Sequence, residues 1–245
     1  MKHRFIAVAL LAAWAAFVTV SARAAEKTEA PKPEAGKNGW IALFDGKNDL
    51  KGWHPRPGKP ADKFAWVAKD GMLINEKNDA TDIISDVPQM DHELHVEFCC
   101  PPGGNSGVYL QGRYEVQVDD SSGAYRAKRL SNTMCGAIYS KIAPKASVNP
   151  GEVTDKTYAD ATNWQTFDIK FWSAQLGPDG KVAKKARITV VHNGVPIIED
   201  AEINGVTGSA VDNKEGTPAG LMLQGDHSRM KYRNILYRPM KAEAK

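Results

Sequence analysis

The sequence motifs that mark several large enzyme classes are missing from this chain of 245 residues. It has no GxSxG motif, no P-loop, no HExxH motif and no GxGxxG motif after an expected strand. These motifs hold an elbow serine, nucleotide phosphates, a catalytic zinc ion and a dinucleotide, respectively. Elbow-serine acyl transfer, nucleotide-driven chemistry and zincin proteolysis therefore lose support.

Cysteine is scarce, with only Cys99, Cys100 and Cys135 in the chain. There is no CxxC pair and no zinc-type spacing. Adjacent side chains point to opposite faces of a strand, so Cys99 and Cys100 cannot share one environment. In an oxidising compartment Cys135 could bridge to one of them. Buried thiols are an equally good interpretation, and the disulfide state stays open.

No apolar run reaches the length of about 20 residues that a membrane span needs. The longest apolar segment, Phe5–Val20, follows Lys2 and Arg4 and precedes Ala22-Arg23-Ala24. This order of positive, apolar and small residues is typical of a cleaved secretion signal. We predict a signal peptide over residues 1–24 and a periplasmic or secreted protein without integral membrane association. An uncleaved anchor is the alternative.

Net charge is nearly absent from the expected mature chain. The formal charge of +3 reflects 32 Lys and Arg against 29 Asp and Glu, and three of the basic residues lie in the signal (Lys2, Arg4 and Arg23). A balanced chain lacks the basic surface that binds nucleic acid or anionic membranes. We therefore expect a small neutral ligand, no nucleic-acid partner and an oligomeric state that composition does not indicate.

Aromatic residues are absent from residues 25–38, which are rich in Ala, Glu, Lys and Pro. This composition predicts a flexible linker. One globular domain is then expected over residues 39–240, which is long enough to bury a substantial core.

Long helical periodicity is also absent, and the sequence has many short strand-like segments between Gly, Asn and Asp turns. The best hairpin signal is Asn193-Gly194, between residues 186–192 and 195–198. Ten or more such strands predict an all-β sandwich or barrel. Three more pairs are expected: 64–68 with 72–75, 164–172 with the segment after Pro178-Asp179-Gly180, and 219–224 with 232–237.

The most informative segment, residues 105–120, alternates between apolar and polar side chains. Val108, Leu110, Tyr114, Val116 and Val118 occupy the even positions. The odd positions hold Tyr109, Gln111, Arg113, Glu115, Gln117 and Asp119. One face is therefore core and the other is polar, and a hairpin at Gly112 could preserve both faces. A polar face is ordinarily solvent-exposed, but Gln and Tyr also suit the recognition of hydroxyl groups.

Glu115, Gln117 and Asp119 are spaced two residues apart on one face of an expected strand. Residues two apart on one strand face lie roughly 6–7 Å apart, and catalytic carboxyl pairs lie about 5–5.5 Å apart in retaining enzymes and 6.5–9.5 Å apart in inverting ones. Glu115 and Asp119 alone are too far apart, at roughly 13 Å. A pair across strands, such as Glu115 with Glu97, is the alternative.

Four residues elsewhere are further candidates. Trp53, in the Pro-rich segment 52–60, could stack on a sugar ring if it is exposed, although most tryptophans here are expected in the core. His227 follows a strand and is a candidate acid or base. Tyr139 and Lys141 share a face at strand spacing, where Lys141 could stabilise an oxyanion or simply be solvated.

Several motifs in order resemble one known family. They are Trp40–Lys47 with Gly52-Trp53, Trp66-Val67 with Asp70-Gly71, Asn105–Tyr109, Tyr114–Val118, Gly136–Tyr139, Asn163-Trp164, His192–Gly194, Gly220–Gln224 with His227, and Arg233–Ile235. Together they are similar to the 3-keto-disaccharide hydrolase family, also described as 3-keto-glucoside lyase and 3-keto-2-hydroxy-glucal hydratase. The sequence departs from the family at Cys99–Pro102, where a basic residue is more usual.

This resemblance implies a concanavalin-like jelly roll of two antiparallel sheets, with the site on the concave sheet, and sugar chemistry in the bacterial periplasm. A ketone at sugar carbon 3 acidifies the proton on carbon 2, so the site needs a base, an oxyanion partner and hydroxyl anchors. The expected base is Glu115 and the expected acid His227, with Arg113 or Lys141 near the enolate. The expected hydroxyl anchors are Asn105, Tyr109, Gln117, Tyr139, Trp53 and Gln224.

A divalent metal ion could replace the cationic side chain, with Glu97, Glu115 and Asp119 as hard oxygen ligands; no dedicated metal loop is visible. Three rival functions remain open. They are a non-catalytic carbohydrate-binding module, a conventional two-carboxylate glycoside hydrolase, and a structural domain of the cell envelope.

Overall fold

A computed structural model describes residues 32–44, 46–47, 49–120, 122–149 and 163–241 of the chain. The predicted signal peptide, residues 1–24, and residues 25–31 of the predicted linker lie outside these ranges. Among the described residues, no helix has the length and apolar character of a membrane span.

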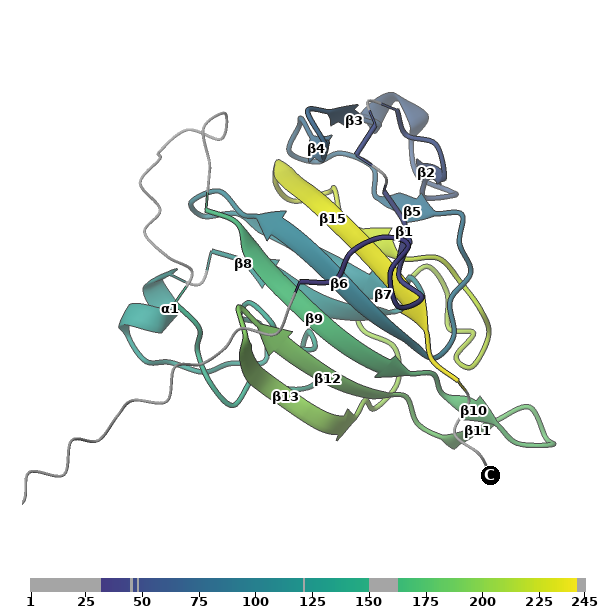
Figure 1. Ribbon diagram of the computed structural model, residues 1–245. Coiled ribbons are helices and arrows are strands. Elements are labelled where there is room, and N and C mark those ends of the chain that lie inside the picture. Colours follow the sequence, from purple (N-terminus) through teal and green to yellow (C-terminus); the bar gives the residue numbers. More distant parts are fainter. Residues whose placement is uncertain (1–31, 45, 48, 121, 150–162, 242–245) are drawn as a thin grey trace, which may run out of the picture. The chain divides into compact units, whose positions relative to one another are not determined.

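The described chain is all-β and folds as two packed antiparallel sheets (Figure 1). The larger sheet has the order β13-β12-β9-β6-β15-β4-β3, with β1 also paired to β15, and the smaller has the order β2-β5-β14-β7-β8. The predicted two-sheet jelly-roll sandwich of the concanavalin type is confirmed. The bounds of the larger sheet are β1 Ile41–Ala42, β3 Trp66–Lys69, β4 Met72–Asn75, β6 His92–Cys99, β9 Gln165–Trp172, β12 Arg187–His192, β13 Val195–Glu202 and β15 Met230–Pro239.

The smaller sheet and the remaining elements are short. Its strands are β2 Trp53–Pro55, β5 Ile83–Ser85, β7 Asn105–Leu110, β8 Tyr114–Asp119 and β14 Met222–Leu223. The remaining elements are the hairpin β10 Gln175–Leu176 and β11 Val182–Lys184, the 3-10 turn Ala61–Lys63, and the one-turn helix α1 Ser122–Arg126. The described residues therefore contain little helix, as the absence of a 3.6-residue periodicity in the sequence predicts.

The core lies between the two sheets and follows the alternation of the strands. Strand β6 contributes Leu94, Val96 and Phe98 from the larger sheet. Strands β7 and β8 contribute the even-numbered apolar residues, including Val108 and Val116, from the smaller sheet. One polar bond also crosses this core, where the Ser106 and Tyr232 hydroxyls lie 2.8 Å apart.

The hairpin at Gly112 preserves the two predicted faces. Leu110 opposes Tyr114, and Tyr109 opposes Glu115. Three residues, 111–113, connect the strands, so each odd-numbered residue opposes another odd-numbered one. Gln111 and Gly112 have φ values of +52° and +61°, and the Arg113 N–H donates to the Leu110 carbonyl at 3.0 Å, which is the pattern of a type I′ turn. The polar side chains of both strands therefore remain on one outer face.

Two of the predicted strand pairs are wrong. Strand β9 pairs with β6 and β12, and the turn at Pro178–Gly180 instead joins β10 to β11. Strands β14 and β15, expected to pair, belong to different sheets. Turn residues identify where a chain reverses, whereas the partner of a strand depends on contacts distant in sequence. The pairs β3–β4 and β12–β13 are confirmed.

Two open questions about individual side chains are also settled. Trp53 is buried in the core, where its indole Nε1 donates to the Leu43 carbonyl at 2.8 Å. The predicted stacking of Trp53 on a sugar is therefore wrong, since no ring face is available. All three cysteines, which lie in the described ranges, are buried and form no disulfide.

Two neutral histidines in the interior predict an acid-sensitive fold. Burial lowers the pKa of His192 to about 3 and that of His92 to about 4. The unfolded chain takes up these protons near pH 6.5, before the folded chain does. Their stabilisation is therefore complete above pH 6.5 and is lost as the pH falls toward 4.

We expect the free energy of unfolding, measured with urea, to fall by up to about 2.7 kcal/mol per pH unit from these two groups. A His192→Gln variant keeps a donor for the Gln165 side chain, which lies 2.8 Å away, and should lose half of this dependence. The exposed His54→Gln change is the matched control. Equal pH dependence in wild type and His192→Gln would contradict the assignment.

Candidate functional site

A row of side chains crosses the outer face of the smaller sheet. Strand pairing places Glu115 beside Tyr109, Tyr109 beside Met222, and Met222 beside Ile84. Tyr109, Met222 and Ile84 pack together as a small apolar cluster away from the main core. Glu115 is therefore a carboxylate at the end of an apolar row, on the face opposite to the core.

Glu115 is buried, with 3% of its surface exposed. Burial raises the pKa of Glu115 to about 7, with contributions from the charges of Asp226 and Asp82, while a hydrogen bond from the Tyr109 hydroxyl opposes the shift. A carboxyl group with this pKa is present in both protonation states near neutral pH. Such a group suits general acid–base chemistry.

Gly107 provides the space in which the Glu115 carboxyl group lies. Gly107 opposes Gln117 on β8, and a Cβ atom at this position would lie 2.5 Å from Glu115 Oε1 and 2.7 Å from Tyr109 Cε2. No side chain larger than hydrogen fits there without moving one of these groups. The glycine therefore leaves, in the outer face of the sheet, the space that the Glu115 carboxyl group occupies, and we call this space the Gly107 recess.

Two glutamines border this recess with unpaired carbonyl oxygens. Gln117 donates to Asn105 Oδ1 at 2.8 Å, and the Gln224 backbone N–H donates to the Gly107 carbonyl at 3.0 Å. Both side-chain Oε1 atoms are buried and have no hydrogen-bond partner among the described residues. Buried polar atoms are rarely left without a partner. These two acceptors therefore point to a ligand or water with hydroxyl donors.

The other acids of the site are held in place. Asp82 accepts from the Gly225 N–H at 2.9 Å and from Arg56 at 3.0 Å. Asp226 lies 2.5 Å from Nδ1 of His227, whose side chain is about half exposed. Asp226 therefore orients the His227 ring, and its charge also contributes to the raised pKa of Glu115.

A segment that we call the wall loop, residues 205–217, lies along the edge of β8. The Thr207 hydroxyl accepts from the Glu115 backbone N–H and donates to the Arg113 carbonyl, both at 3.0 Å. Arg56 donates to the carbonyls of Ser209 and Ala210 at 2.8 and 2.7 Å. The loop is thus fixed beside the acid by contacts from two distant parts of the chain.

Arg113 also holds the wall loop through its side chain. Its guanidinium donates to Asp212 at 2.6 Å and to the Thr217 carbonyl at 2.7 Å. The expectation that Arg113 acts near an enolate is therefore corrected to a positioning role, because its donors are committed to the loop.

Tyr139 and Lys141 do not share a strand face. They lie in a tight turn closed by the bridge between Ile138 and Ile142. The Tyr139 backbone N–H donates to the Glu115 carbonyl at 3.2 Å, so this turn borders β8. Lys141 is exposed and donates to the Asn204 carbonyl at 3.0 Å, which removes the basis for its expected role.

The predicted metal ligands are not brought together. Glu97 lies on β6 of the larger sheet, whereas Glu115 and Asp119 lie on β8 of the smaller one. The two strands present their apolar residues to the same core, so their polar residues point in opposite directions. The cross-strand pair of Glu115 with Glu97 is therefore also wrong. Among the described residues, no group of three or more His, Cys, Asp or Glu is arranged to hold a metal ion.

The sequence interpretation named Glu115, Tyr109, Gln117, Asn105, Gln224 and His227, but it missed three contributors. These are Asp82, Arg56 and Thr207. Gly107 was noticed as part of the Asn105–Tyr109 motif, but its role in leaving room for the Glu115 carboxyl group was not predicted. The three missed residues join the site only through contacts with residues far away in the sequence.

The buried carboxyl group predicts a stability gain when it is replaced. In the unfolded chain Glu115 ionises near its ordinary pKa, and in the folded chain only near 7. The contribution of the protonated Glu115 side chain to the stability of the fold is therefore present below the pKa that Glu115 has in the unfolded chain. This contribution is lost as the pH rises to about 7. Glu115→Gln should be more stable than wild type above pH 7, by up to about 3 kcal/mol, and equally stable near pH 4.

The measurement is urea unfolding of both proteins across this pH range. Glu76→Gln, the same change at an exposed position, is the control and should show no such difference. A Glu115→Gln variant less stable than wild type at pH 8 would contradict the raised pKa.

Three solved structures from Parabacteroides distasonis, each described as a proposed glycosyl hydrolase, are similar to this chain. The first is 28% identical with a TM-score of 0.64, and the match covers 83% of this chain and 84% of that one. The second is 23% identical with a TM-score of 0.54 and full coverage of that chain. The third is 15% identical with a TM-score of 0.57. The last two support the fold alone.

No curated protein matches this sequence. The profile of a family described as the 3-keto-alpha-glucoside-1,2-lyase-like domain matches residues 39–238, which include every residue of the site. The chain therefore belongs to the 3-keto-α-glucoside-1,2-lyase-like family of carbohydrate-active, jelly-roll proteins.

Proposed function

We propose that the protein is an exported enzyme that cleaves 3-keto-glycosides, or hydrates the product, by enolate chemistry with Glu115 as the base. The observation that carries this proposal is the Glu115 carboxyl group, buried in the Gly107 recess with a pKa near 7. Family membership supports the substrate class. Export rests on the signal-like order of residues 1–24 alone.

The reaction would begin with removal of the proton on sugar carbon 2, which the ketone at carbon 3 makes acidic. The electron pair of that C–H bond forms the enolate and then the double bond between carbons 1 and 2, and the glycosidic oxygen leaves carbon 1. Tyr109 holds the Glu115 carboxyl group through its hydroxyl. Water adds to carbon 1 in the reverse sense when the product is hydrated.

His227 is the proposed acid for the leaving oxygen. Asp226 contacts its Nδ1 at 2.5 Å, so the ring is oriented by this carboxylate and Nε2–H would be the group that donates to the leaving oxygen. The unpaired oxygens of Gln117 and Gln224 would accept hydrogen bonds from hydroxyl groups of the sugar. Asn105 fixes the Gln117 amide for this purpose.

A conventional two-carboxylate glycosidase fits the site less well. Such an enzyme needs a second catalytic carboxyl group, and Asp82 is the candidate for it on this face. Both oxygens of Asp82, however, accept hydrogen bonds, from Arg56 and Gly225. The Asp82 carboxylate is thus held by the protein itself, whereas burial raises the pKa of the Glu115 carboxyl group to about 7.

Activity of the full chain on a 3-keto-glucoside is the first test. Loss of the glycoside and appearance of enone absorbance should both occur, with a rate that rises as the pH increases through about 7. Glu115→Gln should lower kcat by about 10²-fold or more, as expected for loss of a general base. Unoxidised β-glucans should not be cleaved.

Cleavage of unoxidised β-glucans would instead support the two-carboxylate mechanism. Binding of sugars without turnover in wild type would support a carbohydrate-binding module. Full activity of Glu115→Gln would show that this carboxyl group is not the base.

A Gly107→Ala change tests the recess itself. The added Cβ would meet Glu115 Oε1 at 2.5 Å, so the carboxyl group must move while the rest of the sheet is retained. We expect kcat/KM to fall by at least about 10-fold, as small displacements of catalytic groups do. Gly123→Ala, whose Cβ would meet no atom within 4 Å, should keep wild-type activity. Equal activity of the two variants would contradict the role of the recess.

A further inference from the structure

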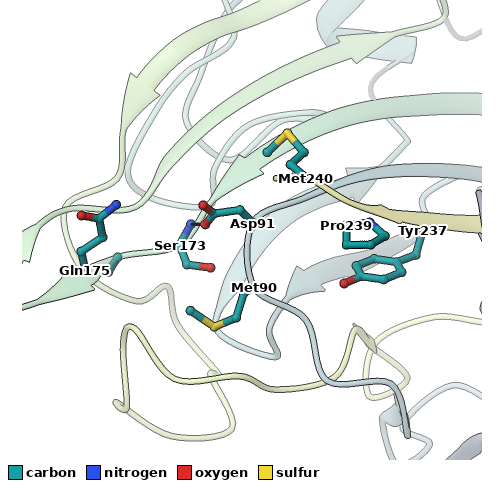
Figure 2. A pocket seen from close by; sticks show the side chains of 8 residues that line it. Met90, Asp91, Ser173, Gln175, Tyr237, Pro239 and Met240 are labelled. Atoms are coloured by element: carbon teal, nitrogen blue, oxygen red, sulfur yellow. Dashed lines mark hydrogen bonds between the residues drawn. The ribbon is translucent and has the colours of Figure 1, made fainter. Parts of the chain in front are cut away.

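A pocket of about 330 Å³ lies at the end of the larger sheet, where β6 begins and where β9 and β15 end (Figure 2). It is lined by Met90, Asp91, Ser173, Gln175, Tyr237 and Pro239, with Ala174 and Met240 beside them. None of these residues belongs to the Glu115 site. A volume near 300 Å³ is at the lower limit of small-molecule sites and suits a single six-membered ring.

The polar groups of the pocket are fixed and keep unused hydrogen-bonding capacity. Asp91 Oδ1 accepts from the Ser173 backbone N–H at 2.8 Å, a contact drawn in Figure 2. The Ser173 hydroxyl accepts from Gln111 Nε2 at 3.0 Å, so its own proton is available to a ligand. In the described part of the chain, no donor reaches Asp91 Oδ2. An acceptor and a donor therefore lie next to each other in the wall.

A second polar layer lies directly behind this wall. The fully buried Gln111 amide donates to Ser173, to the Gln89 carbonyl at 2.8 Å and to Met90 Sδ at 3.5 Å. Its Oε1 has no partner among the residues described, and neither side-chain atom of the buried Gln89 has one. An unsatisfied buried polar atom costs about 1–3 kcal/mol. Neither glutamine lines the pocket, so this layer holds the Ser173 hydroxyl in place and does not itself contact a ligand.

The other walls are apolar and include rings. Figure 2 shows the Tyr237 ring next to Pro239, with Met240 and Met90 on either side of the space. The C–H face of a sugar ring packs well on such surfaces, while its hydroxyls need the acceptors and donors of Asp91, Ser173 and Gln175. An anion is disfavoured by the Asp91 carboxylate, and a wholly apolar ligand by the polar wall.

We propose that this pocket is a second binding site, specific for a neutral polyhydroxylated ring of the sugar type. It is separate from the Glu115 site and does not depend on 3-keto chemistry. Gln111 is its positioning residue, because it orients the Ser173 hydroxyl.

Methionine methyl groups can report on the two sites independently. Met90 and Met240 line the pocket, whereas Met222 packs on Tyr109 beside Glu115. The experiment is a titration of the full chain, labelled with ¹³C in the methionine methyl groups, with methyl α-glucoside. The signals are assigned with Met90→Leu and Met240→Leu. We expect saturable shifts of the Met90 and Met240 signals that do not require any change at Met222.

Asp91→Asn and Ser173→Ala should each weaken this binding by at least about 5-fold, the loss of roughly one hydrogen bond. Gln175→Ala, at an exposed position that cannot unfold the core, should weaken it too. Gly123→Ala is the control and should bind as wild type does.

Two results would overturn the proposal: the absence of saturable shifts at Met90 and Met240, or unchanged binding in both Asp91→Asn and Ser173→Ala. A shift of Met222 without any at Met90 or Met240 would reject this pocket and leave the proposed catalytic site intact. Shifts at Met90 and Met240 without one at Met222 would support the pocket and leave the catalytic proposal untouched, because methyl α-glucoside lacks the 3-keto group.

Discussion

The register of the β7–β8 hairpin is the constraint on which the site depends. With Leu110 opposite Tyr114, every apolar residue of both strands faces the core, and Tyr109, Gly107 and Glu115 meet on the outer face. A slip by one residue would place Glu115 in the core and Val116 in the site. The burial of Val108, Val116 and their neighbours therefore fixes the position of the Glu115 carboxyl group indirectly, because a shifted register would expose them.

The wall loop depends in turn on this hairpin. Arg113 follows the turn and binds Asp212 and Thr217, while Arg56 connects Asp82 to Ser209 and Ala210. The contacts to the wall loop join residues about 100 to 150 positions apart in sequence, whereas Arg56 and Asp82 are 26 positions apart. The two arginines thus hold the wall loop beside Glu115, whose burial raises its pKa.

This arrangement separates what the sequence could predict from what it could not. Alternation is a local property, so the two faces of β6, β7 and β8 and the hairpin at Asn193-Gly194 were predictable. The assignment of strands to sheets depends on distant contacts, which is why Glu97 was placed with Glu115 and β14 with β15. Trp53 was misplaced for a similar reason, since its partner, the Leu43 carbonyl, belongs to a segment without periodicity. Arg56 and Asp82 carried no local signal at all.

Both sheets have a polar outer face, and hydrogen bonding distinguishes a structural face from a functional one. On the larger sheet, burial acts to raise the pKa of Glu97, but hydrogen bonds from Asn234 and Arg233 outweigh it and lower the pKa. Arg233 also stacks on Trp164, with 3.8 Å between its guanidinium carbon and the ring centre. On the smaller sheet, Glu115 keeps a raised pKa, and two glutamine oxygens have no partner within the described ranges. Buried polar atoms that the fold leaves without a hydrogen-bond partner lower the stability of the protein. They are retained where a ligand supplies the missing hydrogen bonds.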